Sequence, residues 1–154
     1  MVELRQAEPR DVPALTVLME DIDRFYGAPE VESSDQRAQA IAACLFQEPK
    51  AAYVLLAWDG EQLIGMAAYS FLWPAAGVTR SLYLKELYVT EAFRRQGIGT
   101  LLMQELYRVA ADHMCSRVEW TADAGNVLAD GFYTRLGVPV NRGKIFYRVE
   151  GGGV

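Results

Sequence analysis

The segment at residues 94–100, Arg-Arg-Gln-Gly-Ile-Gly-Thr, constrains the fold more than any other part of the sequence. Residues 81–89 before it, SLYLKELYV, are rich in β-prone side chains and predict a strand. Residues 101–113 after it carry apolar side chains at helical spacing and predict a helix. The glycines let the turn bend and approach a ligand, and the first N–H groups of the helix lack internal partners and carry partial positive charge. This order therefore predicts an anion site, most naturally for phosphate.

The glycine spacing excludes two common phosphate motifs. The dinucleotide fingerprint requires a third glycine where Leu102 stands, and the P-loop requires a Gly-Lys-Ser/Thr that does not follow. The pattern that is present is Arg-x-x-Gly-x-Gly, with Arg94, Gly97 and Gly99. It resembles the pyrophosphate-binding motif of the GNAT acetyltransferases, whose ligand is acetyl-CoA.

The order of expected elements resembles the GNAT fold along almost the whole chain. Strands are expected at residues 2–7, 52–58, 62–72, 81–89, 117–121 and 144–149, and helices at about 9–26, 36–47, 101–113 and 126–136. Asp59-Gly60 predicts a hairpin, Ser34 or Asp35 is the expected cap of the second helix, and the unit at 81–121 adds a parallel pair of strands. We therefore expect an α+β fold with a mixed, mostly antiparallel sheet and helices on both faces. Residues 1–150 would form one domain, and residues 151–154 a flexible tail.

Glu86 is the first candidate catalytic residue. A regular strand places its side chain on one face with Leu84 and Tyr88, and Lys85 then lies on the opposite face. A carboxylate in a central strand is costly unless it is paired or functional, and burial raises its pKa toward that of a general base. Amine acetylation needs such a base, because an ammonium must lose a proton before it attacks a thioester. The alternative is a Glu86 held in a salt bridge or at a strand edge.

Tyr133 is the second candidate, and its role depends on the resemblance. From spacing alone, Phe132 and Tyr133 suit core packing under a sheet. In GNAT enzymes, however, an asparagine followed seven residues later by such a tyrosine marks the second CoA-contacting region, and Asn126, Tyr133 and the following Leu136-Gly137 match it. The resemblance implies that Tyr133 protonates the leaving thiolate and that Asn126 bonds the pantetheine arm.

The same resemblance implies the other residues that bind acetyl-CoA. The pantetheine arm would pair like an added strand with the backbone of Leu87, Tyr88 and Val89. The pyrophosphate would meet, mostly through N–H groups, the residues of the basic turn: Arg94, Arg95, Gln96, Gly97, Gly99 and Thr100. The alternative for the two arginines alone is a solvated turn.

The blocks YLKELYV and RRQGIG resemble the diamine (spermidine/spermine) branch of the family, which also includes thialysine acetyltransferases. That branch has two adjacent acids where this chain has Lys85-Glu86, and a lysine there would repel a polycation. The resemblance implies direct acetyl transfer from acetyl-CoA to a small primary amine in a ternary complex, by a homodimer. Rival functions are acetylation of a peptide or protein amine and a catalytically silent acyl-CoA-binding module.

Composition limits the partners. The net charge of −5 argues against nucleic acid and is compatible either with a cationic ligand or with simple solubility. The acidic loop region (Asp21, Asp23, Glu30 and Glu32) is either part of a substrate site or a solvated surface. Cys44 and Cys115 have no metal spacing, no apolar run reaches about 18 residues, and the N-terminus does not read as a signal peptide. We expect a cytoplasmic protein that binds no metal and no membrane.

Overall fold

The computed structural model describes residues 1–29 and 32–152, which divide into two compact units, Met1–Thr121 and Ala122–Val154. Glu30 and Val31 of the expected polar loop, and Gly153 and Val154 of the expected tail, lie outside the described residues.

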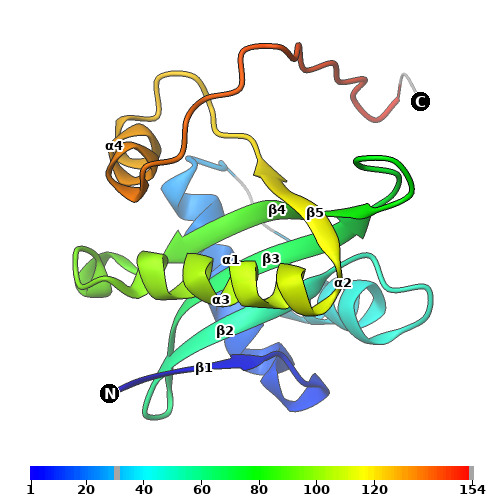
Figure 1. Ribbon diagram of the computed structural model, residues 1–154. Helices are drawn as coiled ribbons and strands as arrows, with labels where there is room; N and C mark the ends of the chain where they lie inside the picture. The colour runs from blue at the N-terminus through cyan, green and yellow to red at the C-terminus, as the bar shows by residue number, and fades with distance from the viewer. Residues whose placement is uncertain (30–31, 153–154) are drawn as a thin grey trace. The chain divides into compact units, whose positions relative to one another are not determined.

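The first unit is built on a five-stranded sheet in the order β1-β2-β3-β4-β5 (Figure 1). The strands are β1 (Val2–Gln6), β2 (Tyr53–Asp59), β3 (Gln62–Leu72), β4 (Arg80–Val89) and β5 (Cys115–Trp120). Neighbouring strands are antiparallel except β4 and β5, which are parallel. The predicted hairpin is present, with Asp59 opposite Gln62. The expected mixed, mostly antiparallel sheet is confirmed.

Helices cover both faces of this sheet, and in Figure 1 α3 lies in front of it and α1 behind it. A short 3-10 turn (Pro9–Asp11) leads into α1 (Val12–Phe25), which is followed by α2 (Ser34–Phe46); α3 spans Ile98–Asp112. The core on the α1 side contains Leu15, Leu18, Ile22, Val54, Leu56, Met66 and Tyr88, with Ile41 and Leu45 of α2 packed against it. The expected cap of α2 was wrong: Ser33 is the N-cap, and it exchanges hydrogen bonds with Gln36 in a capping box.

A β-bulge in β4 corrects the predicted faces of that strand. Ala68 lies opposite Glu86 and Tyr69 lies opposite Leu84, so Lys85 is an extra residue without a counterpart in β3. Because directly opposed residues share a face and successive residues of β3 alternate, Leu84 and Glu86 lie on opposite faces. Leu84 is on the α3 side, whereas Glu86 and Tyr88 are on the α1 side. The expectation that Glu86 shares a face with Leu84 was therefore wrong.

The second unit contains α4 (Val127–Leu136), which Asn126 caps at its start and Gly137 ends in the left-handed conformation. No strand forms over residues 144–149 in the described chain, so that prediction was wrong. The sequence KIFYRV has strand-like composition, but a strand also needs a neighbour, and residues 122–152 contain no other strand with which it could pair. Its apolar side chains, among them Ile145 and Tyr147, are exposed.

Candidate functional site

The carboxyl end of β4 offers an open strand edge. The pairing of β4 with β5 ends at Leu84 opposite Trp120, while β4 continues to Val89. On its other side β4 stays paired with β3 as far as Val89 opposite Gly65. Over residues 85–89, the edge that faces away from β3 thus has no strand partner within the described chain. Such an edge accepts an extended chain through main-chain hydrogen bonds, and the predicted pantetheine residues Leu87, Tyr88 and Val89 lie on it.

The turn after β4 ends in a helix start that has no side-chain cap. Gly97 is the N-cap of α3 with φ of 80°, a left-handed conformation that favours glycine, and the first intrahelical bond joins Leu101 N to Gly97 O at 3.0 Å. The first turn of α3 contains no acidic residue. The N–H groups of Ile98, Gly99 and Thr100 occupy the positions that have no acceptor within a helix, next to the positive end of its dipole. Gly99 lies inside the helix, not in the turn as the sequence suggested.

The three residues before Gly97 are placed differently from one another. Arg94 is half-buried; its Nε donates to Val89 O at 2.9 Å, and its guanidinium carbon lies 4.8 Å from the centre of the Phe25 ring and 5.4 Å from that of Tyr88. Arg95 is exposed and has φ of 63°. Gln96 is exposed and donates through Nε2 to Ala92 O at 3.3 Å. Only Arg94 is thus fixed against the end of β4.

Glu86 reaches the α1 side of the sheet because of the bulge at Lys85. It is half-buried, and its Oε1 accepts a hydrogen bond of 3.3 Å from the hydroxyl of Tyr26, which directly follows α1. The bulge thus brings a carboxylate of β4 next to the carboxyl end of a helix about 60 residues earlier in the chain. Lys85 is exposed.

Tyr88 joins the same helix to β4. Its hydroxyl donates to Asp21 Oδ2 at 2.7 Å, and only 7% of its surface is exposed. Burial, followed by the neighbouring Asp21 carboxylate, raises the pKa of Tyr88 to about 12, so the phenol stays protonated and can donate. The sequence predicts a role only for the backbone of Tyr88, as part of the edge that pairs with the pantetheine arm. The partnership with Asp21 carries no sequence signal, because the two residues are far apart in the chain.

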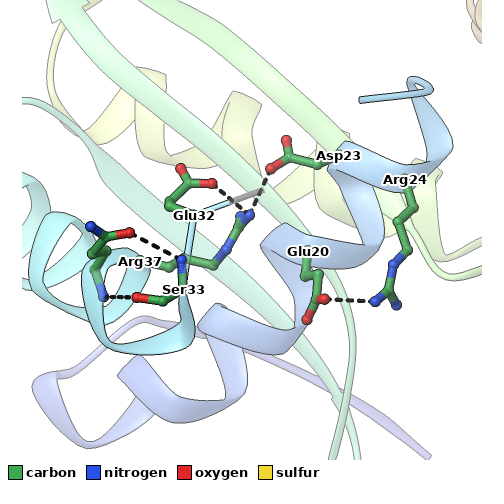
Figure 2. A network of polar contacts seen from close by, with 7 residues as sticks. Glu20, Asp23, Arg24, Glu32, Ser33 and Arg37 are labelled. Carbon is green, nitrogen blue, oxygen red and sulfur yellow. Dashed lines mark hydrogen bonds and ion pairs between the residues drawn. The ribbon is translucent and has the colours of Figure 1, made fainter. Parts of the chain in front are cut away.

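The acidic residues near the end of α1 form ion pairs within the protein (Figure 2). Arg37 of α2, whose side chain is 6% exposed, donates to Asp23 and to Glu32, each at 2.9 Å. This guanidinium joins α1, the loop before α2 and α2 itself. Nearby, the exposed Arg24 pairs with Glu20 within α1 at 2.6 Å. Neither sequence alternative, a substrate site or a solvated loop, describes Asp23 and Glu32 fully, because both carboxylates bind a buried arginine.

The two remaining predicted site residues belong to the second unit. Asn126 accepts from Ala129 N at 3.1 Å through Oδ1, so one of its polar atoms serves as the helix cap. Tyr133 is half-buried, and its ring meets that of Phe132 edge-on at 5.1 Å between ring centres. Both residues lie on or at the start of α4, as the sequence predicted. Their roles toward acetyl-CoA stay predictions.

The described residues contain neither a metal-binding cluster nor a membrane-spanning helix. Among residues 1–29 and 32–152, no group of three or more His, Cys, Asp or Glu side chains could hold a metal ion. In the same residues, none of the helices has both the length and the apolar character needed to cross a membrane.

Comparison with known proteins decides the family. The model of the Acetyltransferase (GNAT) family matches residues 15–138, most of the chain. This chain belongs to the GNAT family. An integron cassette protein from the mobile metagenome of V. cholerae has the same fold, with a TM-score of 0.91 and 30% identity over 99% of this chain and 94% of that one. The family prediction and the fold prediction are therefore both confirmed.

Curated GNAT relatives carry names that specify amine substrates. The thialysine N-ε-acetyltransferase of Mus musculus is 29% identical over 96 residues, 60% of this chain and 56% of the relative. The D-amino-acid N-acetyltransferase of Saccharomyces cerevisiae is 26% identical over 152 residues, 97% of this chain and 91% of the relative. This GNAT chain thus spans about half the length of the mouse relative and nearly all of the yeast one. The predicted resemblance to a branch that includes thialysine enzymes agrees with the first of these names.

Proposed function

We propose that this chain transfers an acetyl group from acetyl-CoA to the primary amine of a small molecule, either a diamine or polyamine or an amino-acid-like compound. The observation that carries the proposal is the open edge of β4, which leads directly into the uncapped start of α3. The edge suits the amide-rich arm of CoA, and the helix start suits its diphosphate. The names of the curated relatives support an amine as acceptor.

Several residues of the chain would hold acetyl-CoA. The backbone of Leu87, Tyr88 and Val89 pairs with the pantetheine arm. The N–H groups from Gly97 to Thr100, with Arg94, Arg95 and Gln96 around them, meet the diphosphate. Asn126 would use its Nδ2, because its Oδ1 caps α4.

Acetyl transfer then requires one base and one acid. The amine enters from the side of α1 and α2, and Glu86 takes its proton, directly or through water. The nitrogen attacks the thioester carbonyl and a C–N bond forms; as the C–S bond breaks in the same ternary complex, the nitrogen loses its second proton to solvent. Tyr133 protonates the leaving thiolate. Neither cysteine takes part, and burial raises the pKa of the Cys115 thiol, which makes it a poor nucleophile at neutral pH.

Among small amines, we propose an amino-acid-like acceptor ahead of a polyamine, because the exposed Lys85 adds positive charge beside Glu86. We also propose a homodimer that works in the cytoplasm without a metal, nucleic acid or membrane partner. The exposed apolar side chains at 145–149 support self-association, since exposed apolar stretches often mark interfaces.

The test is release of free CoA from acetyl-CoA in the presence of a panel of amines. The panel contains thialysine, lysine, ornithine, D-amino acids, putrescine, spermidine, amino-sugars and short peptides. Loss of a general acid or base lowers kcat by about 10²- to 10⁴-fold, so Tyr133→Phe and Glu86→Gln are each expected to lose activity by such a factor. Tyr107→Phe, at a tyrosine on the outer side of α3, is the matched control and should keep wild-type activity.

Each outcome of this test is informative. Turnover of one small amine, lost in both variants, supports the proposal. Turnover of peptides alone would favour a peptide or protein acetyltransferase. Binding of CoA without turnover of any amine would favour a silent acyl-CoA-binding module.

A further inference from the structure

The last turn of α1 places an aromatic side chain in solvent where the sequence predicts a core residue. Phe25 continues the apolar stripe of the helix, in which Leu18 and Ile22 are buried, yet 42% of its surface is exposed. Its ring lies 4.8 Å from the guanidinium carbon of Arg94, in the predicted diphosphate-binding turn. Core packing alone does not explain this position. Contact with the arginine does, because a guanidinium is attracted to the face of an aromatic ring.

Arg94 is held without being neutralised. Within the described chain no carboxylate lies within 4.0 Å of its guanidinium, in contrast to Arg5, which also lies over a ring, that of Trp58, but forms two hydrogen bonds with Asp11. Its Nε donates to Val89 O, and a further side-chain hydrogen bond links it to Tyr88, which is a neutral phenol. The positive charge of Arg94 is therefore not cancelled by a carboxylate and remains available to an anion.

The position of Tyr88, whose ring also contacts Arg94, depends on α1 as well. Tyr88 lies 5.4 Å from the guanidinium carbon, and its hydroxyl is bonded to Asp21, one helical turn before Phe25. The Phe25 and Tyr88 rings meet at an angle of 65° with centres 5.8 Å apart. The amine-side helix thus contacts Arg94 directly through Phe25 and orients the second ring through Asp21.

We propose that Phe25 is a positioning residue that holds the Arg94 guanidinium at the end of β4 for the diphosphate of CoA, a role that rests on the proposed acetyl-CoA-dependent function. The Nε bond to Val89 O fixes one end of the guanidinium, and the two rings restrict its rotation. An arginine that is already ordered loses less side-chain entropy when a phosphate binds, so its contribution to affinity is larger. The helix that borders the amine side thereby also contributes to binding the acetyl donor.

The experiment measures CoA binding by titration calorimetry, without an amine and without turnover. A cation–π contact at a partly exposed site is worth about 0.5–1 kcal/mol, so Phe25→Leu should raise the Kd for CoA about 2- to 5-fold. Phe25→Tyr keeps the ring and should restore wild-type affinity. Pantetheine, which lacks the diphosphate, should bind to Phe25→Leu and wild type equally. In steady-state assays Phe25→Leu should raise the KM for acetyl-CoA by the same factor and leave kcat unchanged.

A double-mutant cycle with Arg94→Gln separates positioning from a general structural role. If Phe25 acts through Arg94, adding Phe25→Leu to Arg94→Gln should not weaken CoA binding further. Val17→Ala, at another exposed apolar position of α1, should change nothing. The role is overturned if Phe25→Leu binds CoA like the wild type, if it weakens pantetheine equally, or if its effect persists in the Arg94→Gln background. A wild-type chain that does not bind CoA would instead refute the proposed function, and this role with it.

Discussion

Two arginines of the first unit, Arg37 and Arg94, are both held in place but by opposite kinds of partner. Arg37 is buried and bonded to the carboxylates of Asp23 and Glu32. Arg94 lies against the rings of Phe25 and Tyr88, and within the described residues it pairs with no carboxylate. One partner of each arginine comes from the same helix, since Asp23 and Phe25 are both in the last part of α1.

The two arginines differ in how much of their positive charge the neighbouring side chains cancel. Two carboxylates more than neutralise Arg37, which leaves it a structural role in joining α1 to α2. Aromatic rings fix the position of Arg94 without cancelling its charge, so it can still bind an anion. One helix thus supplies a carboxylate to Arg37 and an aromatic ring to Arg94.

The largest expected effect is on stability, at Arg37. Arg37→Met removes a buried guanidinium and leaves the half-buried Asp23 and the exposed Glu32 carboxylates close together, which should lower the free energy of unfolding by about 2–4 kcal/mol. Equilibrium unfolding in urea measures it. The matched control is Arg24→Ala, which breaks the exposed pair with Glu20 and should cost about 0.3–0.5 kcal/mol. Equal losses in the two variants would show that Arg37 is not a structural anchor.

An arginine that is bonded to a carboxylate should lose this interaction in acid, when the carboxylate is protonated. Arg5, which donates to Asp11, provides the test. The hydrogen bonds from Arg5 hold the pKa of the buried Asp11 below its ordinary value of 3.8, despite burial. The unfolded chain therefore takes up this proton first, so the stabilisation is complete above about pH 5 and falls as pH drops through 3.8 toward the folded pKa. Asp11→Asn should lose about 2 kcal/mol at pH 7 and show a flatter stability profile between pH 6 and pH 3. Parallel profiles for the two proteins would contradict this account.

The smallest effect on stability is expected at Arg94, which lies against two aromatic rings. Arg94→Gln removes one hydrogen bond to Val89 O and two partly exposed ring contacts, so the free energy of unfolding should fall by less than about 1 kcal/mol. Its Kd for CoA should nevertheless rise about tenfold, because a charged partner of the diphosphate is lost. Unfolding in urea measures the stability, and titration calorimetry on the same preparation measures the Kd for CoA. A large loss of stability with unchanged CoA binding would reverse the roles assigned to Arg94 and Arg37.

The sequence predicted most elements of the first unit because their signals are local. β3 begins and ends at the predicted residues, since the Asp59-Gly60 turn and Trp73-Pro74 mark its limits. α3 starts three residues before the predicted start at residue 101, because Ile98 and Gly99 were assigned to the turn on account of the glycine. The helix start without a side-chain cap, where we propose an anion site, lies where the order of strand, turn and helix places it.

The features that could not be predicted depend on residues far apart in the chain. Arg37 reads as one more polar position of an amphipathic helix, and only the fold brings Asp23 to it. Phe25 belongs to an apolar stripe, yet its ring meets an arginine about 70 residues later. The strand expected at 144–149 had suitable composition but lacks a neighbouring strand in its own unit. The roles of Glu86 and Tyr133 depend on chemistry with a substrate, which neither composition nor backbone geometry can test.

The bulge at Lys85 interrupts the hydrogen bonding between β4 and β3, but it keeps the Glu86 carboxylate out of the apolar core on the α3 side. A regular β4 that kept Lys85 in its ladder with β3 would turn Glu86 toward the α3 side, where Leu84 is 3% exposed. An unpaired carboxylate in such surroundings costs several kcal/mol or becomes protonated, more than one interrupted ladder bond costs. For a chain with a glutamate at this position, the bulged strand therefore has the lower free energy. A more regular β4 would therefore make the folded chain less stable.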